Sequence, residues 1–165
     1  MSTAPTPAPA AGRAESSAGF EPASGSALAG SRNEIPTDAA STVELATRIQ
    51  ESEPRPLLAL GTLHFTLAGS AATLEAYSDS PATATAPAQL FLIFKDQSNG
   101  QPDGSYGAGR FLTPRLLAGD EVVLDFNQAW NPLCAYSHYF HCPLPPRRNW
   151  LPLAIPAGER AYPGH

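Results

Sequence analysis

The sequence predicts an all-β fold, either an antiparallel β-sandwich or a small, partly open β-barrel, with one short N-terminal helix and a disordered N-terminal arm. Short apolar stretches with a period of two recur between residues 57 and 155, and turn dipeptides such as Asn99-Gly100 and Asp103-Gly104 separate some of them. A helical pattern is confined to one short segment. Roughly six to eight antiparallel strands fit this pattern.

The N-terminal part of the chain divides into an arm and a short helix. Residues 1–40 are almost all Ala, Ser, Pro, Thr and Gly, which bury too little apolar surface to repay the entropy of ordering, so we expect disorder there. Residues 41–56 are predicted to form a short helix and a linker. Ser41 or Thr42 is a suitable cap for a segment with apolar residues at Val43, Leu45, Ala46 and Ile49.

Residues 57–165 are predicted to form the β domain. Leu63, Phe65 and Leu67 alternate with polar residues, which predicts a half-buried strand that turns at 68–71 and returns over 73–77. The apolar run 90–94 predicts a strand covered on both faces, and further strands are expected at 106–112, 121–126 and 151–155. Residues 125–151 are expected to form a long ordered loop across one end of the sheet.

Charge and hydropathy exclude several classes of partner. The net charge is −5 and the ten Lys and Arg residues are scattered, so we expect no nucleic acid partner. The chain has no apolar run of the length, about 18 residues, that spans a membrane, and its N-terminus lacks the pattern of a secretory signal. We therefore expect a cytoplasmic protein with no membrane partner, and the sequence suggests no cofactor.

A series of motifs runs through the C-terminal half in a fixed order. They are Tyr106-Gly107-Ala108-Gly109-Arg110, Asp125-Phe126-Asn127-Gln128-Ala129-Trp130-Asn131-Pro132-Leu133-Cys134-Ala135-Tyr136, Cys142-Pro143-Leu144-Pro145-Pro146, Asn149, Leu151-Pro152 and Ala157-Gly158-Glu159. Together with the hairpin at 61–77 and Phe94-Lys95-Asp96, these motifs resemble the domain-of-unknown-function family 1684, a mainly bacterial family, over about residues 57–160. The resemblance supports these domain boundaries and implies no activity. Members of the family usually carry a longer structured region before the hairpin than residues 1–56 indicate.

Polar side chains near one sheet end are the first candidates for chemistry. Asp125 and Asn127 are two residues apart at a strand end and should point to the same face, while Arg110 leaves a Gly-rich turn. Such a group can bind a polar ligand or tune a carboxylate for proton transfer. The interpretation that we favour is structural, with an Arg110–Asp125 pair anchoring the loop and Asn127 satisfying its backbone amides.

Aromatic side chains in the C-terminal block suggest a pocket. Such residues either wall a binding site or cover the open end of the sheet. The set comprises Trp130, Tyr136, Tyr139, Phe140 and Trp150. Combined with the polar group, it gives the predicted ligand-binding residues Arg110, Asp125, Asn127, Trp130, Asn131, Tyr136 and Glu159.

The sequence also offers four residues of types that zinc accepts as ligands, Cys134, His138, His141 and Cys142. The paired spacings of structural zinc sites are absent, and adjacent His141 and Cys142 project in different directions. We therefore predict no metal, and we interpret both cysteines as thiols that pack in a tight loop.

These observations favour a module that binds an unidentified small molecule or protein. The first alternative is a small hydrolase or metal-dependent enzyme that uses Asp125 or the Cys134/His138/His141/Cys142 cluster. The second is a structural or interaction module without a ligand.

Overall fold

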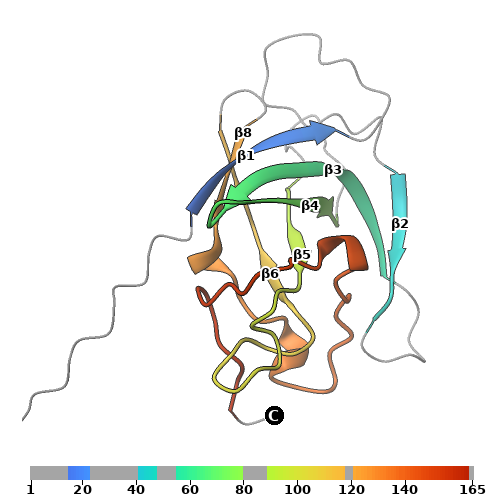
Figure 1. The fold of residues 1–165 in the computed structure, drawn as a ribbon. Helices are drawn as coiled ribbons and strands as arrows, with labels where there is room; N and C mark the ends of the chain where they lie inside the picture. Colours follow the sequence, from blue (N-terminus) through green and yellow to red (C-terminus); the bar gives the residue numbers. More distant parts are fainter. Residues whose placement is uncertain (1–14, 23–40, 48–54, 80–88, 118–120, 164–165) are drawn as a thin grey trace, which may run out of the picture.

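The fold is all-β and antiparallel, as the sequence predicts (Figure 1). The computed structural model of the chain describes residues 15–22, 41–47, 55–79, 89–117 and 121–163. In these residues the strands are β1 Glu15–Pro22, β2 Ser41–Leu45, β3 Arg55–Leu67, β4 Ser70–Ser78, β5 Leu92–Phe94, β6 Arg110–Leu112, β7 Arg115–Leu116 and β8 Glu121–Asp125. None of the helices in this described part is long and apolar enough to cross a membrane.

The larger sheet is organised around the long strand β3. Its strands follow the order β2-β3-β1-β8-β7, and β4 pairs with β3 from outside that path. β2 pairs with residues 55–59 of β3 and β1 with residues 61–65, while β4 pairs along residues 58–67. The β3–β4 hairpin turns at Ala68 and Gly69, whose positive φ angles of 50° and 80° suit a tight turn.

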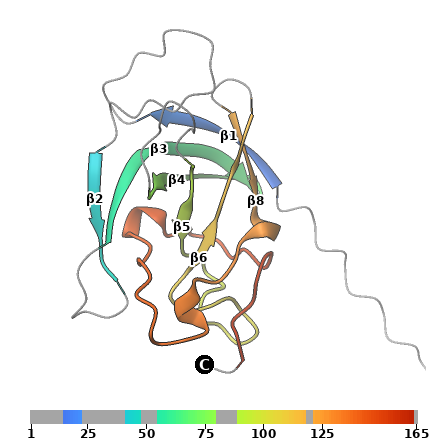
Figure 2. The ribbon, with the colours of Figure 1, turned by 180° about the vertical axis from the view of Figure 1, so that it is seen from behind.

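A second, two-stranded sheet of β5 and β6 completes the enclosure of the core. Two backbone hydrogen bonds between Tyr77 and Phe91, of 2.9 and 2.8 Å, join β4 to the residue before β5. One apolar cluster takes side chains from both sheets and is built around Leu63, Leu92 and Leu124. The two sheets thus wrap around one core in the manner of a partly open barrel (Figures 1 and 2).

The short helix predicted within residues 41–56 is wrong. Residues 41–45 form strand β2, which pairs with β3, and Thr47 makes an isolated bridge to Pro143, while residues 48–54 lie outside the described residues. Val43 and Leu45 alternate with the exposed Thr42 and Glu44, and they pack in a second apolar cluster. In a segment this short, tertiary pairing decides between a period of two and a helical period.

The described residues of the predicted N-terminal arm form a strand. Residues 15–22 form β1, which lies between β3 and β8 in the larger sheet. The rest of the predicted arm, residues 1–14 and 23–40, lies outside the described residues.

The segment after β8 contains no regular strand in its described residues. It runs through three short 3₁₀ helices, η1 Phe126–Gln128, η2 Leu133–Ala135 and η3 Arg147–Asn149. Figures 1 and 2 show these residues gathered with the β5–β6 connection at one end of the molecule. The strand predicted at 151–155 is absent: Leu151 and Ile155 are buried in the core, but Pro152 has no N–H to donate to a ladder.

Candidate functional site

The alternation of side chains along β5 and β6 places two phenylalanines outside the main core. Leu92 and Leu112 face the main core, whereas Ile93, opposite Phe111 in register, packs on the other face with Phe91. Two backbone hydrogen bonds of 2.9 Å tie Phe111 to Trp130. Three aromatic residues from separate segments are therefore held side by side on this outer face.

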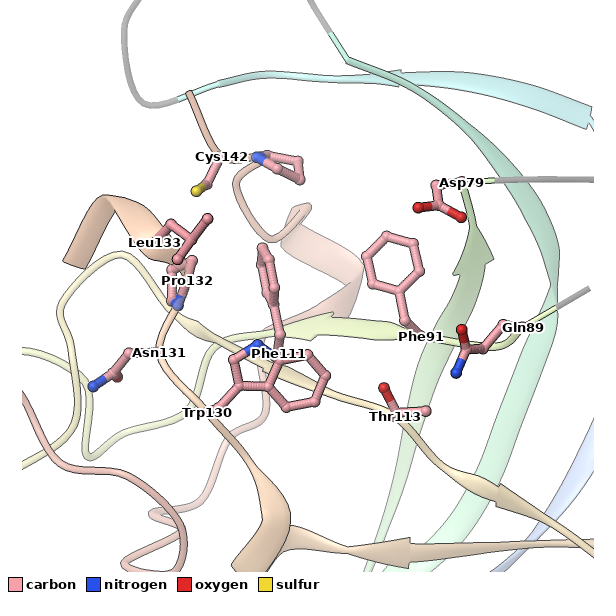
Figure 3. A pocket seen from close by; sticks show the side chains of 11 residues that line it. Asp79, Gln89, Phe91, Phe111, Thr113, Trp130, Asn131, Pro132, Leu133 and Cys142 are labelled. Atoms are coloured by element: carbon pink, nitrogen blue, oxygen red, sulfur yellow. The ribbon is translucent and has the colours of Figure 1, made fainter. Parts of the chain in front are cut away.

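These three rings line a cavity of about 370 Å³, which we call the aromatic cavity (Figure 3). The ring centroids of Phe91 and Phe111 are 6.2 Å apart at an interplanar angle of 66°. Those of Phe111 and Trp130 are also 6.2 Å apart, at 85°. The remaining lining residues are Asp79, Gln89, Thr113, Asn131, Pro132, Leu133, Cys142 and Pro143.

The polar lining of the aromatic cavity is concentrated on one side. Asp79 follows β4, Gln89 precedes β5 and Thr113 follows β6, so all three lie where strands begin or end. Figure 3 shows Asp79 and Gln89 beyond Phe91, on the side away from Trp130. The only charged side chain among the described lining residues is the Asp79 carboxylate.

We predicted that Arg110 pairs with Asp125. Its partner is Asp96 instead. The Arg110 Nη2 donates to Asp96 Oδ2 at 2.7 Å, and the two side chains are 1% and 0% exposed. The guanidinium also donates to the carbonyls of Ile155 and Ala157, and it lies over the Phe94 ring. This ion pair is fully inside the fold and anchors the C-terminal segment to β6.

Asp125 and Asn127 form a local cap on η1. The Asp125 carboxylate accepts the backbone N–H of Asn127 at 3.1 Å and its side-chain amide at 2.7 Å. Both contacts are exposed to solvent. This geometry is that of an N-cap, which satisfies an N–H group that the helix leaves unpaired. Neither residue lines the aromatic cavity.

Glu159 connects two other predicted site residues. Its Oε2 accepts the Asn131 backbone N–H at 2.7 Å and the Tyr136 hydroxyl at 2.8 Å. Partial burial, followed by the hydrogen bond to Glu159, raises the pKa of the Tyr136 phenol. The Asn131 amide donates to the Arg160 carbonyl at 2.7 Å, so this group fastens η2 to the C-terminal residues.

The cysteines and histidines of the C-terminal block are not gathered into one group of side chains. Among the described residues, no three His, Cys, Asp or Glu side chains come together as metal ligands. His138 and His141 are exposed, whereas Cys134 and Cys142 are buried thiols. The Cys134 backbone N–H donates to Cys142 Sγ at 3.4 Å, which places both sulfur-bearing residues in the packing of the loop.

The predicted ligand-binding residues therefore separate into groups. Trp130 and Asn131 line the aromatic cavity, while Arg110 and Glu159 border a smaller cavity of about 120 Å³. The sequence reasoning missed Phe91 and Phe111, because an apolar run predicts only that both faces are covered. The signal that could have found Phe91 and Phe111 is their alternation with Leu92 and Leu112, which places two large aromatic side chains together on the opposite face.

Comparison with known proteins identifies relatives without identifying an activity. Residues 26–160 match the sequence family described as "Protein of unknown function (DUF1684)". The region of the chain that is similar to the family therefore begins before residue 57, where the sequence analysis placed its start. The chain is 34% identical to the uncharacterized protein from gene locus rrnAC0354 of Haloarcula marismortui, whose structure was solved by solution NMR. That match has a TM-score of 0.62 and covers 92% of this chain and 72% of that chain. No curated protein matches the chain.

Proposed function

The chain belongs to the DUF1684 family of proteins of unknown function, and we propose that it is a small-molecule binding module whose ligand occupies the aromatic cavity. The observation that carries this proposal is the grouping of Phe91, Phe111 and Trp130, all half-buried, around an open volume of about 370 Å³. Ligand pockets are typically hollows of roughly 300–1,000 Å³ with apolar and aromatic walls and a few polar groups. The aromatic cavity has each of these properties.

The energetics of the rings support this proposal. Aromatic side chains gain stability by leaving water, and half-buried rings around a hollow retain apolar surface that a ligand can cover. Aromatic residues of the core, such as Phe94 and Phe126, are fully buried, and the rings of these two pack edge to face with their centroids 5.5 Å apart. Among the described residues, the core is therefore filled, whereas one side of the rings in the aromatic cavity is covered by no described residue.

The other predicted site groups support a structural role instead. The buried Arg110–Asp96 pair and the Asp125 cap use their polar atoms to hold the backbone of the chain. In the aromatic cavity, by contrast, three half-buried rings converge on an open volume, and this contrast favours binding there over catalysis at Asp125.

Tryptophan fluorescence tests the proposal, because the chain has two tryptophans and only Trp130 lines the aromatic cavity. In the Trp150→Phe variant, Trp130 becomes the sole reporter. We expect members of a fragment library of small aromatic, aliphatic and cationic compounds to change its emission saturably.

The matched control is Trp130→Phe, in which Trp150 is the sole reporter. Trp150 is 42% exposed and donates its indole N–H to the Pro145 carbonyl at 3.0 Å, outside the aromatic cavity. The same fragments should leave its emission unchanged. If no fragment alters Trp130, or if both reporters respond alike, the proposed binding site is refuted.

A further inference from the structure

We propose that the ligand of the aromatic cavity is a small aromatic compound that carries a hydrogen-bond acceptor, such as a carbonyl oxygen, beside its ring. This inference rests on the proposed function and specifies the ligand class of that site. It follows from three features of the cavity: an accessible indole N–H group without a described acceptor, the steep angles between the rings, and the character of the neutral polar side chains in the lining.

The indole N–H of Trp130 is a donor that has no acceptor among the described residues. The Trp130 backbone exchanges two hydrogen bonds of 2.9 Å with Phe111, and the two rings are in contact, but no described oxygen or nitrogen accepts from Nε1. Trp130 is half-buried, and Nε1 is not among the described polar atoms that are sealed from solvent without a partner. Figure 3 shows this nitrogen on the edge of the indole that faces Phe111. The donor is therefore within reach of a ligand.

Trp150 shows how the same side chain is satisfied elsewhere in this protein. Its N–H donates to the Pro145 carbonyl at 3.0 Å, and Lys95 Nζ and the Arg147 guanidinium carbon lie 4.8 and 4.2 Å from its ring centroid. Buried tryptophans usually pair their N–H group, because a donor that leaves water without a new acceptor costs free energy. A carbonyl oxygen on a ligand would give Trp130 the partner that Pro145 gives Trp150.

The rings of the cavity already follow the geometry that aromatic pairs prefer. Aromatic rings pair best when they are offset or edge to face, with centroids about 4.5–7 Å apart. The centroids of Phe91 and Phe111, and those of Phe111 and Trp130, are 6.2 Å apart, at angles of 66° and 85°. A ligand ring in the open volume can continue this series and gain attraction beyond the area that it buries, whereas a saturated ring gains only from burial.

The neutral polar side chains of the lining do not choose between donors and acceptors. Gln89 and Thr113 are exposed, and each can both donate and accept a hydrogen bond. An indole N–H can only donate. The requirement for an acceptor on the ligand therefore comes from Trp130, while Gln89 and Thr113 can receive a second polar substituent of either kind.

Acetophenone and 2-phenylpropene provide the test, because both join a phenyl ring to a small planar group that ends in oxygen in the first and in CH₂ in the second. The Trp130 indole proton, assigned by its loss in Trp130→Phe, is followed by NMR while each probe is added to the unmodified chain. Both probes bring the same ring, so a difference between them reports the oxygen. We expect acetophenone to move the proton saturably to lower field than 2-phenylpropene does, as a new hydrogen bond requires. Equal movement would overturn the requirement for an acceptor.

Replacing Trp130 by 3-benzothienylalanine keeps the fused rings but puts sulfur in place of the N–H group. The preference for acetophenone, taken as the ratio of the two dissociation constants from ligand-observed NMR, should fall by about threefold to tenfold relative to the unmodified chain. Comparing this ratio between the two proteins cancels the greater hydrophobicity of 2-phenylpropene. The same replacement at Trp150, whose N–H bonds outside the cavity, should leave the ratio unchanged. An equal fall at both positions, or none at Trp130, would contradict the role of the Trp130 N–H.

Phe91→Leu tests the ring geometry, because it keeps an apolar wall and removes one ring. The preference for acetophenone over cyclohexyl methyl ketone, which has a saturated ring beside the same carbonyl, should fall by about twofold to tenfold. The matched control is Phe140→Leu, in which the lost ring is 44% exposed and lies outside the described lining, so the preference should not change. An unchanged preference in Phe91→Leu would overturn the requirement for an aromatic ligand.

Thermal melts establish that each variant is folded before its affinities are interpreted, and the titration of the unmodified chain decides on the acceptor even where a variant fails to fold. If neither acetophenone nor 2-phenylpropene moves the Trp130 signal while other members of the fragment library do, the inference about ligand class fails and the proposed function stands. If no compound moves it, both fail.

Discussion

The buried Arg110–Asp96 pair makes a strong and specific prediction for the variant Asp96→Asn. In the parent chain, Oδ2 accepts from Arg110 Nη2 at 2.7 Å, and Oδ1 accepts from the backbone N–H groups of Ser98 and Ile155 at 2.8 and 3.1 Å. Asparagine offers one oxygen in place of two. Whichever way its amide turns, an NH₂ group faces donors that previously met a carboxylate oxygen.

The cost is that of breaking a buried charge pair from one side. The guanidinium of Arg110 is 1% exposed and keeps its charge, so it remains buried without its counter-ion. Removing one partner of such a pair destabilises proteins by about 3–5 kcal/mol, out of a total folding free energy of typically about 5–15 kcal/mol. We expect Asp96→Asn to lower the free energy of unfolding by about that amount.

Urea denaturation followed by tryptophan fluorescence measures this loss as a change in midpoint at constant slope. The matched control is Asp125→Asn, the same chemical change at an exposed N-cap position, where Asn and Asp are about equally effective. We expect Asp125→Asn to change stability by less than about 0.5 kcal/mol. If Asp96→Asn also costs less than about 1 kcal/mol, the pair does not anchor the C-terminal segment as described.

Two further predictions concern backbone space and pH. Gly109→Ala should destabilise the fold by about 3 kcal/mol or more, because φ is +106° and an added Cβ would lie 2.5 Å from Pro145 Cγ. Gly69→Ala, with φ at +80° but nothing within 4 Å, should cost only about 1–2 kcal/mol in the same thermal or urea unfolding measurement. Burial, and after it the hydrogen bond to Glu75, raises the pKa of Tyr77. The Tyr77 phenol therefore ionises more readily in the unfolded chain, where it loses its proton above a pH of about 10. Above that pH, the free energy of unfolding should fall by up to about 1.4 kcal/mol per pH unit. Tyr77→Phe should flatten this alkaline loss, and an unchanged pH dependence would contradict the assignment.

The sequence predicts the strands best where local pattern and tertiary pairing agree. The hairpin of β3 and β4 combines strict alternation with a tight Ala68-Gly69 turn, and β5 is an apolar run buried on both faces. Ser41–Leu45 was misassigned because a few apolar residues fit a helical and a strand period equally well, and the choice is made by pairing with β3. Such pairing joins distant residues and leaves no local signal.

The candidate site illustrates the same limit. Trp130 and Asn131 were predicted from the density of aromatic and polar residues, and both line the aromatic cavity. Arg110 was predicted to meet Asp125, but its partner is Asp96, since the end of β5 and the start of β6 are opposite each other in register. Which carboxylate reaches a buried guanidinium depends on strand register, and the residue types alone do not determine it.

The most direct test of the central claim is a titration followed by NMR of the two indole N–H groups in the unmodified chain. The signals are assigned with the Trp130→Phe and Trp150→Phe variants, and the members of the fragment library are added in turn. The proposed function predicts that bound compounds shift the Trp130 signal saturably and leave Trp150, 42% exposed and outside the aromatic cavity, unchanged. Compounds that bind the protein yet leave Trp130 unmoved, or shift both signals equally, would contradict the claim that the aromatic cavity is the binding site.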